Sequence, residues 1–104
     1  MTYITKIVIS RSQLIQRRTR IYDDGMILEM MLWDVPGPAA GPLRRLEYAL
    51  SYGNAEAPMI GYGNAAGKGD HRHYGEHQEP YTFISPERLV ADFLADVRAA
   101  RNHG

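Results

Sequence analysis

The apolar and polar residues at the start of the chain follow a strand pattern. Residues 3–10 (YITKIVIS) are rich in β-branched and aromatic side chains, a composition typical of a strand. Residues 13–22 (QLIQRRTRIY) follow as a second extended segment, in which the alternation is weaker. The pattern therefore predicts β-structure from the beginning of the sequence.

A tight turn and an apolar strand come next. Gly25 in Asp23-Asp24-Gly25 can supply the positive φ angle that hairpin turns require. Residues 26–33 (MILEMMLW) then form a nearly continuous apolar run that only Glu29 interrupts. Such a run indicates a strand near the centre of a sheet.

Proline-rich sequence separates this hairpin from the later strands. Residues 35–42 contain three Pro, which remove backbone donors, so we expect a connecting loop there. Residues 43–52 (LRRLEYALSY) have some helix propensity, but their apolar residues alternate with period two and predict a strand. Shorter strands are predicted at residues 59–62 and 81–84.

The C-terminal part carries the start signals of a helix over residues 86–101. Ser85 is a good N-cap, Pro86 suits the first helical position, and Glu87 favours the positive end of the helix dipole. One apolar stripe follows, made of Leu89, Val90, Phe93, Leu94 and Val97. We expect this stripe to pack on a sheet.

These elements predict one α+β domain over residues 1–104. Strands within residues 3–62 and the short strand at 81–84 give a strongly twisted antiparallel sheet of about five strands, covered by the C-terminal helix. Asp92 and Asp96 lie one helical turn apart beside the apolar stripe. We expect them either to form surface pairs, as Arg88 can with Asp92, or to contact the polar segment that precedes the helix.

That polar segment, residues 63–80, is predicted to be a functional loop. It lacks an amphipathic period and contains several Gly together with three of the four His of the chain. Long loops in small domains are usually functional or disordered. The density of titratable and aromatic side chains favours function.

Composition limits the class of protein. The chain has no Cys, which excludes disulfides and thiolate metal sites and fits a reducing compartment. No apolar run approaches the roughly 18–20 residues of a membrane span. The N-terminus also lacks a signal-peptide pattern, so we expect a cytoplasmic protein without a membrane partner.

The formal net charge is zero, so overall charge gives no argument for a nucleic-acid partner. Charge is nevertheless uneven, because residues 11–20 hold four Arg and no acidic residue. Arg17, Arg18 and Arg20 could extend an RNA-binding face, and an ordinary solvated strand face is an equally good interpretation.

Several motifs of the chain occur together in one known family. They are Tyr22-Asp23-Asp24-Gly25, Leu32-Trp33-Asp34-Val35-Pro36, Tyr62-Gly63-Asn64, GKGDHRH at residues 67–73, Pro80-Tyr81-Thr82-Phe83, and Leu89, Asp92, Phe93, Asp96 and Val97. Over roughly residues 13–100 the chain resembles the TumE-type toxins of bacterial type II toxin–antitoxin modules. Residues 1–12 look like an extra segment, and Ala65-Ala66 replaces more polar residues.

The resemblance implies a small cytoplasmic toxin whose partner is a cognate antitoxin, often a helix-turn-helix protein. It leaves the chemistry open. It also leaves open the RNA target and the oligomeric state, for which a dimer is one option.

The residues themselves favour metal-independent RNA cleavage. His71 and His73 can act as general base and acid, and their spacing of two places both rings on one face if the segment is extended. Lys68 and Arg72 can supply positive charge to the phosphate. Asp70 would orient a His or brace Lys68.

Other residues of the segment suit substrate binding. Gly67 and Gly69 would let backbone N–H groups approach phosphate. Aromatic rings can stack a splayed base. The full set of expected substrate-binding residues is Gly67, Gly69, Tyr62, Asn64, Tyr74, Tyr81, Arg18 and Arg20.

Three alternatives remain. Asp70, His71, His73 and His77 are possible ligands of a zinc ion, but Lys68 and Arg72 would oppose a dication, so we expect neither metal nor cofactor. The second alternative is a non-catalytic module whose loop binds nucleic acid or protein. A purely structural loop is the simplest reading of the same residues.

Overall fold

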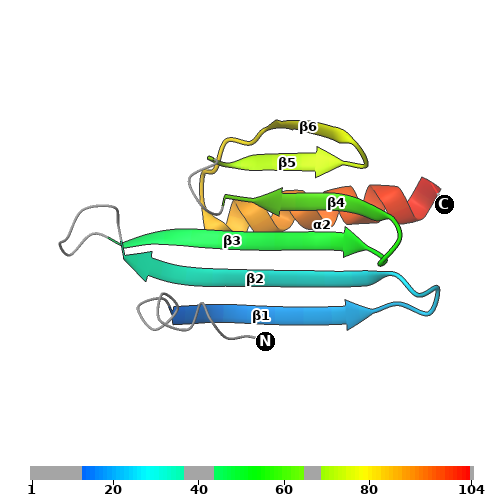
Figure 1. The fold of residues 1–104 in the computed structure, drawn as a ribbon, viewed down its shortest axis with the longest axis horizontal. Helices are drawn as coiled ribbons and strands as arrows, with labels where there is room; N and C mark the ends of the chain where they lie inside the picture. The colour runs from blue at the N-terminus through cyan, green and yellow to red at the C-terminus, as the bar shows by residue number, and fades with distance from the viewer. Residues whose placement is uncertain (1–12, 37–43, 65–68, 104) are drawn as a thin grey trace.

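The computed structural model describes residues 13–36, 44–64 and 69–103, which form one antiparallel sheet and one helix. The six strands lie in chain order across the sheet, so each strand pairs with the next (Figure 1). The elements are β1 (Gln13–Ile21), β2 (Ile27–Pro36), β3 (Arg44–Gly53), β4 (Pro58–Gly63), β5 (His71–Tyr74), β6 (His77–Pro80) and α2 (Pro86–His103).

The helix covers one face of the sheet. Figure 1 views the sheet with α2 behind it, next to β3 and β4. We call the face toward α2 the helix face and the opposite one, which carries Glu29, Ser51, Gly61, His71 and His73, the open face. Among the described residues, no helix covers the open face.

Side chains from β2, β3 and β4 alternate into the core, as the period-two pattern predicted. The helix contributes the stripe that includes Leu89, Phe93 and Val97. The buried residues of this cluster are Leu28, Met30, Leu32, Tyr48, Leu50, Tyr52, Ile60, Tyr62, Leu89, Phe93 and Val97. The predicted α+β class and the helix packed on an antiparallel sheet are therefore confirmed.

The prediction of a loop over residues 63–80 is wrong for its second half. Residues 71–80 form the β5–β6 hairpin, which raises the sheet from about five strands to six. Both strands are polar, because they lie at the edge and neither is fully buried, so hydrophobic alternation could not reveal them. The turn has a local signal in Gly75, whose φ of 55° is the left-handed conformation that Gly tolerates.

Smaller boundary predictions also change. Residues 81–84 form no strand; they connect the edge of the sheet to the helix, and Tyr81 and Phe83 alternate because they pack against the core. The helix extends to His103 instead of residue 101, and β2 continues to Pro36. The strand expected at residues 3–10 lies outside the described part of the chain.

Two further features complete the fold. Ser85 caps the helix, because its Oγ accepts a hydrogen bond from the Arg88 backbone N–H at 3.1 Å. Among the described residues, no helix has the length and apolarity needed to cross a membrane.

Replacing Phe93 with Ala should destabilise the protein by about 3–5 kcal/mol, because the ring is fully buried between helix and sheet and its loss leaves a cavity. Denaturant unfolding measures the change. Arg98→Ala, at an exposed position of the same helix, should stay within about 0.5 kcal/mol of the parent. A loss below about 1 kcal/mol in Phe93→Ala would contradict the packing of α2 described here.

Candidate functional site

His71 and His73 point to the open face of the sheet. Their partners in the β4–β5 ladder are Gly63 and Gly61. Residues directly opposite each other in an antiparallel pair project to the same side, so the two rings lie beside two residues that have no side chains. Both histidines are half-buried. The strand geometry therefore brings the two imidazoles together, as their spacing of two suggested.

The His73 ring lies across the backbone of Gly61. A Cβ atom at that position would lie only 2.6 Å from Cε1 of the ring, so any larger residue would have to displace the histidine. At Gly63 a Cβ would lie 3.7 Å from the His71 ring, which is an ordinary contact. Gly61 is thus the glycine that the position of His73 requires.

The tautomer of His71 follows from its hydrogen bond. Its Nδ1 lies 3.2 Å from the carbonyl oxygen of Gly69. A carbonyl oxygen can only accept, so Nδ1 carries the proton and donates. In the neutral ring Nε2 is then the acceptor, which is the state that a general base requires.

Asp70 contacts the core of the sheet. Its Oδ2 accepts a hydrogen bond of 2.6 Å from the hydroxyl of Tyr48, a buried residue of β3. Burial, followed by the hydrogen bond to Asp70, raises the pKa of the Tyr48 hydroxyl, which therefore stays protonated as a donor. Asp70 was expected to orient a His or to brace Lys68. Lys68 lies outside the described residues, and the carboxylate of Asp70 accepts from Tyr48.

Asn64 extends the pairing of β4 with β3. Its Oδ1 accepts from the backbone N–H of Tyr48 at 2.9 Å, and its Nδ2 donates to the Leu46 carbonyl at 3.0 Å. The side chain thereby takes the place of a further ladder residue. Asn64 was expected to bind substrate, but these bonds give it a structural role.

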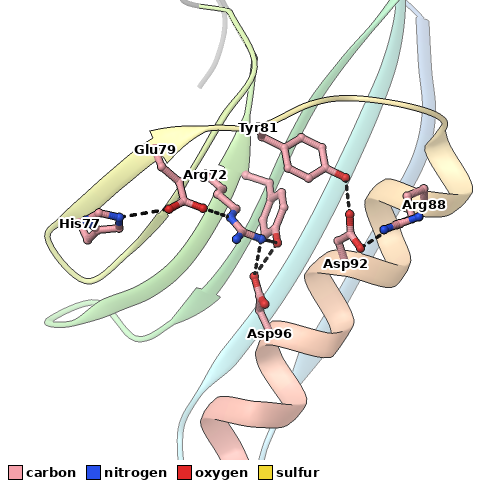
Figure 2. Close-up of polar contacts among 8 residues, drawn as sticks. Arg72, His77, Glu79, Tyr81, Arg88, Asp92 and Asp96 are labelled. Atoms are coloured by element: carbon pink, nitrogen blue, oxygen red, sulfur yellow. Dashed lines mark hydrogen bonds and ion pairs between the residues drawn. The ribbon is translucent and has the colours of Figure 1, made fainter.

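Arg72 points to the helix face, away from the two histidines, because its partner in the ladder is the buried Tyr62. Its Nε donates a hydrogen bond to Oε2 of Glu79 at 2.6 Å (Figure 2). Its Nη1 donates to the Tyr62 hydroxyl at 3.0 Å and lies 3.7 Å from Oδ2 of Asp96. Burial alone would lower the Arg72 pKa, but the hydrogen bonds to Glu79 and Tyr62 raise it. The guanidinium remains charged, and its contacts are with Glu79, Tyr62 and Asp96.

Three tyrosines expected to stack bases also lie on the helix side. The Tyr62 hydroxyl donates to Asp96, and the Tyr81 hydroxyl donates to Asp92 at 2.7 Å. Burial and then these hydrogen bonds raise both tyrosine pKa values, that of Tyr81 to about 12. Tyr74 stacks on His77, with 6.3 Å between ring centroids. Tyr62 of β4 and Tyr81 of the segment after β6 therefore bind α2, while Tyr74 packs within the hairpin, and none of the three lies on the histidine face.

Together these contacts form a polar seam between the β5–β6 hairpin and the helix, which Figure 2 shows. Asp92 and Asp96 belong to it, so the expected contact between the helix and the preceding segment is present. Asp92 also pairs with Arg88 at 3.0 Å. Glu79, which sequence reasoning missed, accepts from Arg72 and lies 3.1 Å from His77. Glu79 pairs with Arg72 across the hairpin, and the opposite charges of these two paired residues are the signal that would have identified Glu79.

The basic residues of β1 lie far from the histidines in the sheet. Arg18 and Arg20 pair with Met30 and Leu28, so they project to the helix face at the opposite edge. The Arg20 guanidinium lies 4.5 Å from the centre of the Tyr22 ring, and that of Arg101 lies 3.8 Å from it. Arg18 and Arg20 therefore do not share a surface with His71 and His73.

Arg17 is the one of the three arginines expected at an RNA-binding face that projects to the open face, because it pairs with Met31 in the ladder. Its Nη2 lies 3.4 Å from Oε2 of Glu29. The register of the β1–β2 hairpin, counted back from its turn, would have separated Arg17 from Arg18 and Arg20.

Two expected residues fall outside the described part of the chain. These are Lys68, expected to contact phosphate, and Gly67, expected to bind it through the backbone. Within the described residues, no group of three or more His, Asp or Glu side chains converges as a metal site would require.

Two hollows lie on the described part of the sheet and helix. One, of about 170 Å³ on the open face, is lined by polar and apolar residues that include Glu29 and Ser51, and Ser51 is the ladder partner of Gly61. A second, of about 450 Å³, lies between the sheet and α2 and is lined mainly by apolar residues such as Met59, Ile60 and Ala100. Only the first lies on the same face as the histidines.

Acid should weaken the polar seam. The hydrogen bond from Arg72 lowers the Glu79 pKa, and those from Tyr81 and then Arg88 lower the Asp92 pKa. A folded-state pKa below the unfolded value gives stability that is present at neutral pH and is lost as the pH falls below about 4. Asp92→Asn should therefore lower stability at pH 7 and flatten its decline at acidic pH.

Urea unfolding between pH 3 and pH 7 measures this dependence. Glu76→Gln, in the exposed β5–β6 turn, is the control and should keep the parent profile. An unchanged acid limb in Asp92→Asn would show that this carboxylate does not stabilise the fold.

Comparison with known proteins agrees with the sequence motifs. The family described as Toxin TumE matches residues 8–101, which is most of the chain. The match begins inside the segment 1–12 that we expected to be extra, so residues 8–12 belong to the family pattern. No curated protein and no solved structure matches the chain. The chain belongs to the TumE toxin family.

Proposed function

We propose that this toxin acts on RNA as a metal-independent endoribonuclease, with His71 as general base and His73 as general acid. The observation that supports the proposal is that both imidazoles project to the open face, with Nε2 of His71 left as an acceptor by the Gly69 hydrogen bond. Toxicity is the property that the family shares, and RNA cleavage is the chemistry that these two side chains suit best.

The reaction would proceed by attack within the RNA strand. His71 Nε2 removes the proton from a ribose 2′-hydroxyl, and the 2′-oxygen forms a bond to the adjacent phosphorus. The bond from phosphorus to the 5′-oxygen of the next nucleotide breaks as protonated His73 donates its proton to that oxygen. The products are a 2′,3′-cyclic phosphate and a free 5′-hydroxyl, and the step needs neither an oxidant nor a metal ion.

Positive charge for the phosphate has to come from groups other than Arg72. The Arg72 guanidinium is on the helix face and is paired with Glu79 and Asp96. We assign this role to Lys68 and to backbone N–H groups around Gly67 and Gly69, which precede His71 in the chain.

Small residues give RNA a path across the open face. In one row across the sheet, Gly63 lies between His71 and Ala49 of β3. In the next row on this face, Gly61 lies between His73 and Ser51. The hollow at Ser51 lies two strands from His73, about 10 Å at the usual strand spacing. A nucleotide next to the scissile phosphate could place its base there.

Replacing either His71 or His73 with Ala should lower cleavage of single-stranded RNA by about 10²–10⁴-fold, because each removes one proton-transfer group. The double variant should be little worse than the worse single variant, since the two act as a unit. Cleavage rates on purified protein, with and without EDTA, measure this. Circular dichroism checks that the fold is intact.

His77→Ala is the matched control, because His77 lies in the same hairpin but stacks on Tyr74 on the other face. It should cleave RNA at the parent rate. Lys68→Ala should be slower than the parent, and Lys68→Arg should recover part of the loss. Parent-like cleavage in both single variants, His71→Ala and His73→Ala, would overturn the proposal and leave the open face as a non-catalytic binding surface.

We further propose that the toxin acts in the cytoplasm and is neutralised by a cognate antitoxin, as its family suggests. Expression of the toxin alone should slow bacterial growth, and co-expression of the neighbouring gene product should restore it. Co-purification tests the complex directly. A neighbouring product that neither binds nor restores growth would contradict the partnership.

A further inference from the structure

A short chain of hydrogen bonds connects the buried core to the ring of His71. The Tyr48 hydroxyl donates to Asp70 at 2.6 Å, and the carbonyl of the preceding residue, Gly69, accepts from Nδ1 of His71 at 3.2 Å. Asp70 therefore lies, in the chain, between Gly69 and His71, the two residues that the second hydrogen bond joins.

We propose that Tyr48 and Asp70 are positioning residues that hold His71 in the Nδ1–H tautomer, and so hold its Nε2 ready as the base. The inference rests on the proposed ribonuclease function for its catalytic meaning. The structural part, that Tyr48 controls the His71 tautomer, can be tested without any activity.

Tyr48 is a rigid anchor for this purpose. Its side chain is 1% exposed and stacks against Phe83, with ring centroids 5.8 Å apart. Its backbone N–H is bound by Asn64 in the continuation of the ladder. Because both the ring and the backbone of Tyr48 are held in place, its hydroxyl fixes the position of the Asp70 carboxylate that it binds.

Asp70 is held at two points, which fixes the backbone around it. Its carboxylate accepts from Tyr48, and its carbonyl accepts from the Tyr81 backbone N–H at 3.1 Å. Gly69, just before it, has a φ of 75°, a conformation that few other residues adopt readily. This special backbone turns the Gly69 carbonyl toward His71, and the two bonds to Asp70 keep it there.

The arrangement parallels the way proteins orient other functional histidines. The partner of one ring nitrogen sets which nitrogen keeps the proton. Removing such a supporting contact usually lowers activity by about 10–100-fold without removing a reacting group. The expected effect of losing Tyr48 is thus smaller than that of losing His71.

The experiment compares Tyr48→Phe with Tyr52→Phe. Tyr52 lies on the same strand and the same face and is 3% exposed, and its hydroxyl also has a partner, Arg101, at 2.8 Å. Each variant removes one buried hydroxyl from one strand, so both report the general cost of the change. Only Tyr48 contacts Asp70.

Nitrogen-15 chemical shifts of the His71 ring report the tautomer in the intact protein. In Tyr48→Phe they should move from the Nδ1–H pattern toward the average of both tautomers, and RNA cleavage should fall by about 10–100-fold. In Tyr52→Phe the shifts and the rate should match the parent. Asp70→Ala, which removes the acceptor of the Tyr48 hydroxyl, should behave like Tyr48→Phe.

Unchanged His71 shifts in a folded Tyr48→Phe protein would overturn the inference. Equal losses of activity in Tyr48→Phe and Tyr52→Phe without a tautomer change would also overturn it, because they would reveal a general packing effect. If the parent protein does not cleave RNA, the ribonuclease proposal fails, while the shifts still decide whether Tyr48 sets the tautomer.

Discussion

The ladder between β4 and β5 is the interaction on which the candidate site depends. In this ladder His71 and His73 pair with two glycines of β4. Arg72 and Tyr74 pair with two buried residues of the same strand. Because side chains alternate across a strand, one register creates two different surfaces. A shift by one residue would exchange them, burying the histidines against the helix and leaving the arginine on the open face.

The helix face of the same hairpin explains why this register is stable. Arg72, Glu79, Asp96 and the Tyr62 hydroxyl satisfy one another where the hairpin meets α2. A polar edge strand has little apolar area to bury, so such bonds have to specify its position. Half-buried ion pairs of this kind add modest stability. Because they form only when the charged groups are correctly placed, they favour this strand register over others. The open face is thereby left to the two histidines.

The structure separates the predicted site residues between the two faces of the sheet. The spacing of His71 and His73 indicated a common face, and the Gly-rich sequence before them indicated a special backbone, which Gly69 has. The sequence could not show that Arg72 projects the other way, because its role depends on which face of β5 the helix covers. Tyr48 was equally hidden, since a buried tyrosine in an alternating strand is read as core, and its hydroxyl partner lies 22 residues away.

Local patterns alone determined the main elements. A nearly continuous apolar run predicted β2, alternating apolar residues predicted β3, Gly25 predicted the turn before β2, and Ser85-Pro86 predicted the start of α2. Each signal lies within a few residues of the structure that it specifies. Only the tertiary structure decided that residues 71–80 form the sheet edge and that Arg18 and Arg20 lie on the far side from the histidines. Backbone hydrogen bonds hold β5 and β6, whose polar side chains show no hydrophobic alternation. The surface on which Arg18 and Arg20 lie depends on which face of the sheet α2 covers, and no local pattern in β1 shows that.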